Sequence, residues 1–236
     1  MKSLHSLLLA GTLLGFLSLS AQADHHGAKP NTLTDKEKAD GWKLLFDGKD
    51  LSKHFRNYNG EGINEKWQVK DDAFTLTAKG GGDIITKEQY GAFEIKLDYK
   101  ISKGGNSGLM YHVTEVAGSP PWKTGPEMQI QDNVDGKDPQ KAGWLYQLYK
   151  AETDATNPAG EWNTVHVIIT PEKCVHYMNG TKYCEYVKGS KEWDEKVAAS
   201  KFSKFPDFGK PTKGHINLQD HGNVVSFRNV KIKSLD

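Results

Sequence analysis

The residues best suited to chemistry form a short alternating segment, Glu-Met-Gln-Ile-Gln at 127–131. Successive side chains of a β-strand point to opposite faces, so Glu127, Gln129 and Gln131 share one face. The two apolar residues between them occupy the other face, which must therefore be the core. A carboxylate and two planar amides on one surface can bracket hydroxyl groups, as a sugar-binding groove requires. An ordinary solvated face of an antiparallel sheet would show the same pattern.

Two further segments place polar side chains on one face of an expected strand. In the segment 105–113 this face carries Asn106, Gly108, Met110 and His112, opposite Leu109, Tyr111 and Val113. In the segment 214–222 it carries His215, Asn217, Gln219 and His221, opposite Ile216 and Leu218. Gly108 would allow a ligand to approach the backbone. A lone histidine is more often structural than catalytic, so His112 and His221 are candidates only if their strands neighbour Glu127.

Four aromatic residues in or near expected loops could stack on a pyranose ring: Trp122, Trp144, Tyr146 and Trp162. Packing in the core or at its rim is the competing interpretation for each of them.

Other chemistries find little support in the sequence. It has no glycine-rich phosphate loop before a helix, no G-x-S-x-G and no H-E-x-x-H motif. The run 132–138 resembles a calcium loop but lacks an oxygen ligand at its third position and a terminal bidentate glutamate. The sequence therefore predicts no metal site.

The composition narrows the function classes. The chain has 236 residues, with 31 Lys and Arg against 30 Asp and Glu. This near-balance argues against nucleic acid and anionic lipid as partners. With 36% hydrophobic and 26% charged residues, the chain is neither a disordered tail nor a membrane bundle.

The N-terminal residues predict a signal peptide over 1–23. A positive start precedes the apolar stretch Leu7–Leu19, and Ala21-Gln-Ala23 has the pattern that signal peptidase reads. The apolar stretch is short for a bilayer span of about 20 residues, which disfavours the alternative of an uncleaved anchor. We therefore expect a periplasmic or secreted protein, not membrane-bound after cleavage, with a disordered leader over 24–33 and one domain over 34–236.

Period-two patterns dominate the rest of the chain. Alternating segments lie at 42–46, 67–69, 73–77, 92–99, 108–113, 127–131, 164–169 and 224–227. Such segments, separated by Gly, Asn and Asp, predict an all-β sandwich or barrel. Any helix is expected to be confined to loops and to one or two turns over 34–40, capped by Thr34 or Asp35. The polar, lysine-rich segment 188–211 is expected to be a long surface loop.

The two cysteines of the chain, Cys174 and Cys184, flank a hairpin centred on Asn179-Gly180. A three-residue loop with a glycine bulge would place them opposite each other, and an exported protein could then form a disulfide. A two-residue loop would set Cys174 opposite Glu185 and leave two free thiols. We expect the disulfide, with the register deciding the outcome.

Taken together, these motifs resemble the 3-keto-disaccharide hydrolase family, also described as 3-keto-glucoside 1,2-lyase/hydratase domains. The matching segments run in family order: Leu33–Gly48, Gly105–Gly108, Pro126–Asn133, Asn157–Asn163, Met178–Gly180, Leu218–Gly222 and Phe227–Ile232. The resemblance implies a concanavalin A-like jelly-roll sandwich of two curved antiparallel sheets, with the ligand groove on the concave one. It also implies an exported enzyme whose substrate is a glycoside oxidised to a ketone at C3.

The resemblance suggests a mechanism with one carboxylate. The segment 127–131 resembles the acidic strand of laminarinase-type glucanases with only the first carboxylate, Glu127, retained. Ordinary glycoside hydrolysis usually needs two carboxyl groups. In a 3-keto sugar the ketone acidifies the C2 proton, so Glu127 alone could remove it, and the enolate would expel the C1 substituent. Water could then add to the product and complete a net hydrolysis.

The remaining candidates are expected to support this base. His112, or His221 with Gln219, would stabilise the enolate or protonate the leaving group. Asn106, Gln129, Gln131, Trp144 and Tyr146 would bind the sugar. No cofactor is required, although a divalent metal in the groove could stabilise the enolate. A non-catalytic carbohydrate-binding module and an endo-β-glucanase remain the alternatives.

Overall fold

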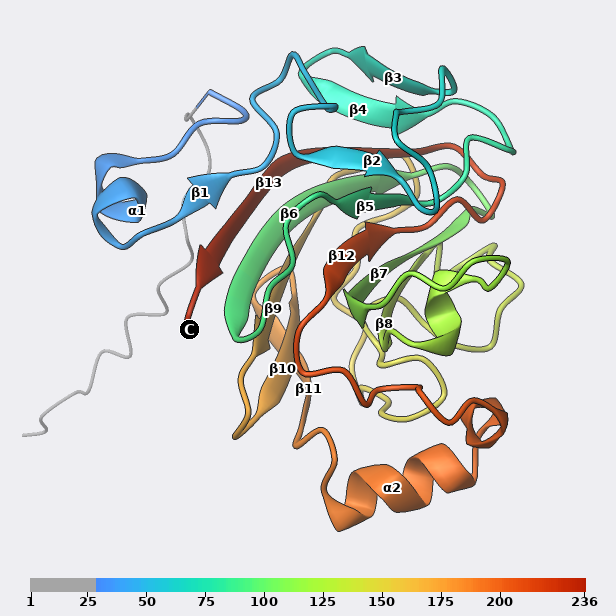
Figure 1. Ribbon diagram of the computed structural model, residues 1–236. Helices are drawn as coiled ribbons and strands as arrows, with labels where there is room; N and C mark the ends of the chain where they lie inside the picture. The colour runs from blue at the N-terminus through green and yellow to red at the C-terminus, as the bar shows by residue number, and fades with distance from the viewer. Residues whose placement is uncertain (1–28) are drawn as a thin grey trace, which may run out of the picture.

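The computed structural model describes residues 29–236, and the predicted signal peptide lies outside this range. The chain forms two antiparallel sheets that pack face to face, as predicted (Figure 1). The eight-stranded sheet contains β1 (Lys43–Leu44), β3 (Trp67–Lys70), β4 (Ala73–Leu76), β6 (Phe93–Ile101), β9 (Asn163–Ile169), β10 (Cys174–Met178), β11 (Thr181–Tyr186) and β13 (Val225–Ser234). Its order is β11-β10-β9-β6-β13-β4-β3, with β1 also paired to β13.

The second sheet has five strands and carries the segments singled out for chemistry. Its members are β2 (Phe55–Asn57), β5 (Ile84–Thr86), β7 (Asn106–Val113), β8 (Glu127–Gln131) and β12 (His215–Leu218). They are ordered β2-β5-β12-β7-β8, so the segments containing Glu127, Gly108 and Asn217 lie on three adjacent strands.

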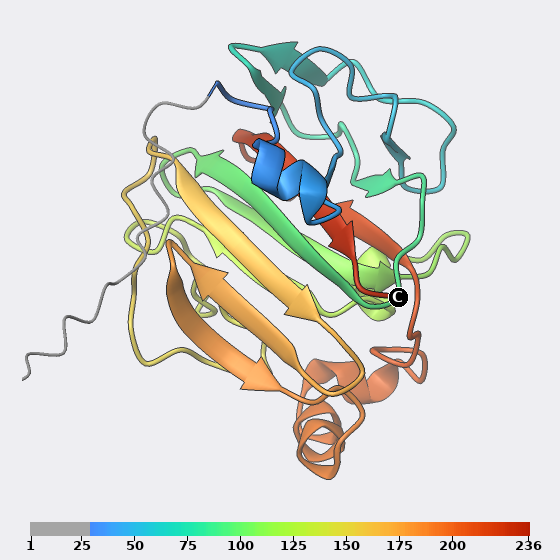
Figure 2. The same ribbon diagram turned by 90° about the vertical axis from the view of Figure 1, so that its left-hand side faces the viewer.

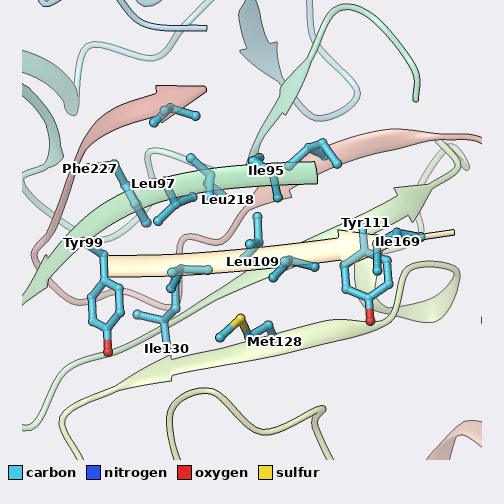
Figure 3. Close-up of a cluster of buried hydrophobic side chains, with 14 of the residues drawn as sticks. Ile95, Leu97, Tyr99, Leu109, Tyr111, Met128, Ile130, Ile169, Leu218 and Phe227 are labelled. Carbon is cyan, nitrogen blue, oxygen red and sulfur yellow. The ribbon is translucent and has the colours of Figure 1, made fainter. Parts of the chain in front are cut away.

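Alternating apolar residues from both sheets fill the space between them (Figure 3). The side chains labelled in the figure come from β6, β7, β8, β9, β12 and β13: Ile95, Leu97, Tyr99, Leu109, Tyr111, Met128, Ile130, Ile169, Leu218 and Phe227. Complete burial of one such aliphatic or aromatic side chain stabilises a fold by about 1.5–3 kcal/mol. Because Met128 and Ile130 face this core, Glu127, Gln129 and Gln131 face outward. We call the side of the five-stranded sheet that faces away from the core its outer face.

The predicted N-terminal helix is present as α1 (Asp35–Ala39). Thr34 is its cap, and a reciprocal pair of hydrogen bonds with Glu37 forms a capping box. The side chain of Lys231 on β13 forms an ion pair with Glu37, which fixes α1 against the eight-stranded sheet (Figure 2).

The segment 188–211 is not a plain loop, so that prediction is wrong. It contains α2 (Lys191–Ala198) and the 3₁₀ helix η2 (Lys201–Lys204). Three aromatic residues anchor it: Phe202 and Phe208 stack with ring centroids 3.8 Å apart, and Trp193 packs 5.5 Å from Tyr186 of β11. Because most residues of the segment are polar, the packing of these three aromatic residues could not be predicted from the sequence. No helix within residues 29–236 is long and apolar enough to cross a membrane.

The structure also corrects the expected disulfide. The hairpin has the two-residue turn, because Met178 pairs with Thr181, and a bulge on β11 shifts the register further. Cys174 therefore lies opposite Tyr186, and Cys184 lies opposite His176. Both cysteines are buried, free thiols in the same core, so the direct pairing required for the predicted bridge does not form.

A second bulge breaks the alternation of β7. Asn217 pairs with Met110 but His215 pairs with Val113, so β7 carries one residue more than β12 over this stretch. The extra residue is accommodated at His112, whose φ of 53° lies in the left-handed region. The backbone of Gly214 lies against this bulge: a Cβ atom there would be 2.5 Å from the carbonyl carbon of His112 and 2.7 Å from the oxygen of Val113.

We therefore expect Gly214→Ala to destabilise the fold by about 2 kcal/mol or more, because only backbone movement could relieve the overlap. The free energy of unfolding from urea titration measures the effect. Gly62→Ala is the matched control, since no atom lies within 4 Å of its added Cβ. Equal, small losses in both variants would contradict the packing account.

Candidate functional site

The outer face of the five-stranded sheet brings together polar residues from three strands. Asn217 on β12, Met110 on β7 and Glu127 on β8 form one cross-strand row. In the next row Gly108 pairs with Gln129, and beyond it Asn106 pairs with Gln131. Directly opposed residues share a face of the sheet, so these side chains form a continuous polar floor.

Glu127 lies on β8 at one side of this floor, over the backbone of Gly108. A Cβ atom at Gly108 would overlap Oε1 of Glu127 and lie 2.8 Å from its Cδ. The glycine therefore makes room for the carboxyl group of Glu127. It does not provide the approach for a ligand that the sequence suggested.

The environment of Glu127 favours its protonated form. The residue is only 6% exposed, and no hydrogen bond from a described residue acts on its carboxyl group. Burial raises its pKa to about 8, and the negative charges of Asp83 and Asp138 add to the effect, while Lys201 opposes it. Such a carboxyl group can release or accept a proton near neutral pH.

Asp83, immediately before β5, is a half-buried carboxylate that the sequence reasoning missed. Its Oδ1 accepts a hydrogen bond from the backbone N–H of Asp220 at 2.9 Å, and its Oδ2 accepts one from Asn217 Nδ2 at 3.2 Å. Burial raises its pKa to about 6. The three glycines directly before it, at 80–82, were the available signal: Asp220 binds the backbone N–H groups of Gly80 and Gly82 and shapes this turn.

Lys201 is the other residue that the sequence reasoning missed, because it lies in the segment expected to be a loop. Its ammonium group lies 4.3 Å from the ring centroid of Tyr146 and 5.0 Å from that of Trp122. Cation–π contacts of this kind hold the charge in place. Tyr146 also donates a hydrogen bond to Asp138 at 2.9 Å. Lys201 thus contacts both aromatic rings, and its positive charge lowers the pKa of Glu127.

A pocket of about 420 Å³ opens beside this floor. Asp83, Gln219, His221 and Trp122 line it, so two predicted residues and one predicted platform meet there. Glu127 does not line this pocket, but Asp83, whose charge acts on Glu127, does. His221 is exposed at the rim.

Several amide oxygens on the outer face are buried without a hydrogen-bond partner in the described residues. They belong to Asn106, Asn217, Gln219 and Gln131. Buried acceptors of this kind are costly, and hydroxyl donors of a ligand would satisfy them. The amide nitrogen of Gln131 donates to the carbonyl oxygens of Asp138 and Gln140, whereas its oxygen has no partner in the described residues. Its side chain holds the 132–149 segment in place, which is a structural role.

Trp144 and Tyr146 lie on the segment 143–146, which pairs with the free edge of β8. Leu145 forms an isolated bridge with Met128 and shares the core. Alternation then places Trp144 and Tyr146 on the outer face, beside Gln129 and Glu127. Trp162 lies elsewhere: its ring contacts Arg228 on β13 of the other sheet, 4.1 Å from the guanidinium carbon.

His112 is absent from this site, which corrects its predicted role. The bulge in β7 turns its side chain away from the outer face, so that its ring packs against Phe93 of the opposite sheet with centroids 5.9 Å apart. Its Nδ1 accepts a hydrogen bond from Lys188, and its Nε2 donates one to the carbonyl oxygen of Gly91. His112 therefore cannot stabilise an intermediate formed at Glu127.

Within residues 29–236 no three His, Cys, Asp or Glu side chains are grouped closely enough to hold a metal ion. The outer face thus offers amide oxygens and two separate carboxyl groups, and the residues do not form a carboxylate- or imidazole-based metal site.

The raised pKa of Glu127 makes stability depend on pH. Because the folded protein disfavours the ionised carboxylate, its stability is full below pH 4.5 and falls as the pH rises toward about 8. Glu127→Gln removes this ionisation, so we expect it to stabilise the fold by about 3 kcal/mol near pH 7 and hardly at all near pH 4. Urea titrations at both pH values measure the difference. Glu65→Gln, at an exposed glutamate, is the control, and a gain independent of pH would contradict the assignment.

The architecture and the sequence both have relatives among known proteins. Residues 41–233 match the family model of the 3-keto-alpha-glucoside-1,2-lyase-like domain. A 3-keto-disaccharide hydrolase of Bacteroides thetaiotaomicron is 32% identical over 232 residues, which covers 84% of this chain and 80% of the relative.

Two solved structures from Parabacteroides distasonis, both of candidate glycosyl hydrolases, are also similar. One is 40% identical with a TM-score of 0.81 and covers 88% of this chain and all of its own. The other is 31% identical with a TM-score of 0.62 and covers 82% and 99%. The resemblance seen in the sequence motifs is thereby confirmed. The chain belongs to the 3-keto-alpha-glucoside-1,2-lyase-like domain family.

Proposed function

We propose that this protein is an exported, carbohydrate-active enzyme that cleaves 3-keto-glycosides by elimination across C1 and C2. The names of its relatives support carbohydrate cleavage as the general activity. The observation that carries the proposal is the carboxyl group of Glu127, buried on a polar floor, without a hydrogen-bond partner in the described residues and with a pKa near 8. The predicted signal peptide supports a periplasmic or secreted location.

Glu127 acts as the base in this proposal. A carboxylate of ordinary pKa is a weak base toward carbon, whereas one with a pKa of about 8 has more driving force to accept a proton. The ketone at C3 acidifies the C2 proton by delocalising the negative charge onto its oxygen. Removal of that proton gives an enolate, the electron pair returns to form the C1–C2 double bond, and the C1 substituent leaves. Addition of water to this product completes a net hydrolysis.

Lys201 replaces His112 as the group that stabilises the negative charge. Its ammonium group is held by Tyr146 and Trp122 and acts electrostatically on Glu127. When the proton passes from C2 to Glu127, negative charge moves from the carboxylate to the enolate oxygen, and a fixed cation nearby stabilises both forms. The unpartnered amide oxygens of Asn217 and Gln219 accept hydrogen bonds from sugar hydroxyl groups and orient the ring.

Direct hydrolysis is a second candidate because the structure supplies a second carboxyl group. Asp83 has a pKa of about 6 and influences Glu127 electrostatically. A pair with separated pKa values can divide the roles of acid and base. In this alternative Glu127 would protonate the glycosidic oxygen and Asp83 would act on C1 or on water, so that the C2–H bond is never broken.

Isotope incorporation separates the two reactions. In deuterated water, elimination followed by hydration should place deuterium at C2 of the released 3-keto sugar, as read by NMR or mass spectrometry. Direct hydrolysis through an oxocarbenium ion leaves C2 unlabelled. The free 3-keto product, incubated with and without the enzyme, controls for exchange after release. Cleavage without label at C2 would refute elimination.

The kinetics of two matched variants test the roles of the carboxyl groups. Glu127→Gln should lower kcat by about two to four powers of ten, as expected for the loss of a general base, while sugar binding by calorimetry persists. If elimination is correct, Asp83→Asn should retain most of the kcat and chiefly raise KM.

The pH profile adds an independent criterion. The ionised form of Glu127 is the active one, so kcat/KM should rise with pH up to about 8 and then level off. A bell-shaped profile that rises up to about pH 6 and falls above about pH 8 would instead favour the paired-carboxyl hydrolysis, which needs ionised Asp83 and protonated Glu127. Unchanged turnover in Glu127→Gln would refute both roles given to Glu127, whereas sugar binding without turnover in the wild-type protein would leave a binding module.

A further inference from the structure

A cavity of about 590 Å³ opens at one end of the sandwich. It is formed where β6 begins, β7 and β9 end, and the segments after β11 and before β12 meet. Its lining includes the apolar residues Ala92, Ile169 and Pro171 together with Thr170, Thr212 and Lys188. None of its lining residues also lines the pocket on the outer face. The cavity is therefore a separate site with a mixed apolar and hydroxyl-bearing wall.

Lys188 is held in this cavity by two hydrogen-bond acceptors. Its Nζ donates to Nδ1 of His112 at 2.7 Å and to the carbonyl oxygen of Pro211. The Nε2 of His112 lies 2.8 Å from the carbonyl oxygen of Gly91, which can only accept, so this nitrogen carries the proton and Nδ1 has a free lone pair. The orientation of the imidazole is thus fixed by a third group, the arrangement typical of activated nucleophiles.

The two acceptors of the Lys188 Nζ, Nδ1 of His112 and the carbonyl oxygen of Pro211, match the two N–H donors of a neutral amine. A neutral amine has two N–H donors and one lone pair. With both donors bound to His112 and Pro211, the lone pair is the group left over for the cavity that Lys188 lines.

Burial, rather than a neighbouring charge, favours the neutral state of Lys188. Burial lowers its pKa to about 8, with the thiol of Cys174 on β10 acting weakly in the opposite direction. Lys213, which precedes β12, lines the same cavity. The carboxylate of Asp236, after β13, is bound by the backbone N–H groups of Gly91 and Ala92, and its hydrogen bonds go to them.

The arrangement of His112 and Lys188 requires a strained backbone conformation at His112. Its left-handed φ of 53° is unfavourable for a residue with a side chain, and the opposing glycine at 214 is required to accommodate it. This distortion is what directs the imidazole into the cavity and toward Lys188. An unstrained β7 would leave His112 on the outer face, where alternation predicts it.

We propose that Lys188 is an amine nucleophile at which this cavity binds a small aldehyde or ketone, including the open-chain form of a reducing sugar, as an imine. The lone pair of Nζ attacks the carbonyl carbon, and the π electrons of the C=O bond move to oxygen, giving a carbinolamine. The two protons of the amine leave with that oxygen as one molecule of water, and the C=N bond forms. No oxidant or reductant is needed, and the site is independent of Glu127 and the outer face.

Reductive trapping of the native full-length chain tests the proposal. Glyceraldehyde and sodium cyanoborohydride are added near pH 7.5, and labelled lysines are quantified by peptide mapping. About a quarter of a lysine with a pKa near 8 is neutral at this pH, against about one in a thousand at the ordinary value. Lys188 should therefore be labelled at least about tenfold faster than Lys213 in the same sample, with a rate that levels off above pH 8.

Two variants and an internal comparison decide the outcome. Lys188→Met should remove the fast phase, and Lys213→Met, at the wall of the same cavity, should retain it. If Lys188→Met fails to fold, the wild-type protein still decides: the preference for Lys188 must be present in the native state and disappear in urea. Labelling of Lys188 at the rate of the other lysines, or its protection from labelling, would overturn the proposal.

Discussion

The side chain of Glu127 lies directly over Gly108 on the neighbouring strand, and its carboxyl group has no hydrogen-bond donor to compensate for its burial in the described part of the chain. An ionised group in this position is expensive, by several kcal/mol if fully charged. The protein tolerates it because the opposite face of β8 contributes Met128 and Ile130 to a large apolar core. The inner face of β8 thus stabilises the fold through Met128 and Ile130, whereas the outer face destabilises it through the buried Glu127. Glu127 is also the group on this strand that can transfer a proton near neutral pH.

Burial of Glu127 depends on segments that are distant in sequence. The bare edge of β8 is covered by residues 143–146, and Gln131 holds the connecting segment by two hydrogen bonds. The 188–211 segment contributes Lys201, anchored through the stacked rings of Phe202 and Phe208. The connecting segment before residue 143 carries Asp138, whose charge raises the pKa of Glu127. The 188–211 segment carries Lys201, whose charge lowers it. The segments that bury Glu127 therefore also supply the charged groups that set its pKa.

The strands and the face of Glu127 could be predicted because alternation is a local property of the sequence. Contributions from distant segments could not be predicted in this way: Asp83 precedes a three-residue strand, and Lys201 lies in a segment whose few aromatic anchors are diluted by lysines and glutamates. Both errors of register come from one residue more or less than the alternation assumed. An extra residue in β7 removed His112 from the outer face, and a turn of two residues where three were expected moved Cys174 out of alignment with Cys184. Because the side-chain period of a strand is two, one inserted residue changes every inference beyond it.

The bulge in β7 also separates two kinds of chemistry that would interfere with each other. A histidine on the outer face beside Glu127 would be a competing acceptor for its proton and would bring a polar group into the environment that raises its pKa. Turned through the left-handed backbone at 112, the same imidazole instead orients an amine at the end of the sandwich. Gly214 makes this possible by leaving space where any side chain would collide with the bulge. The pKa values of a carboxyl group and of an amine are each shifted toward neutral pH by burial in separate regions of the fold, and the conformation of His112 places its imidazole beside the amine.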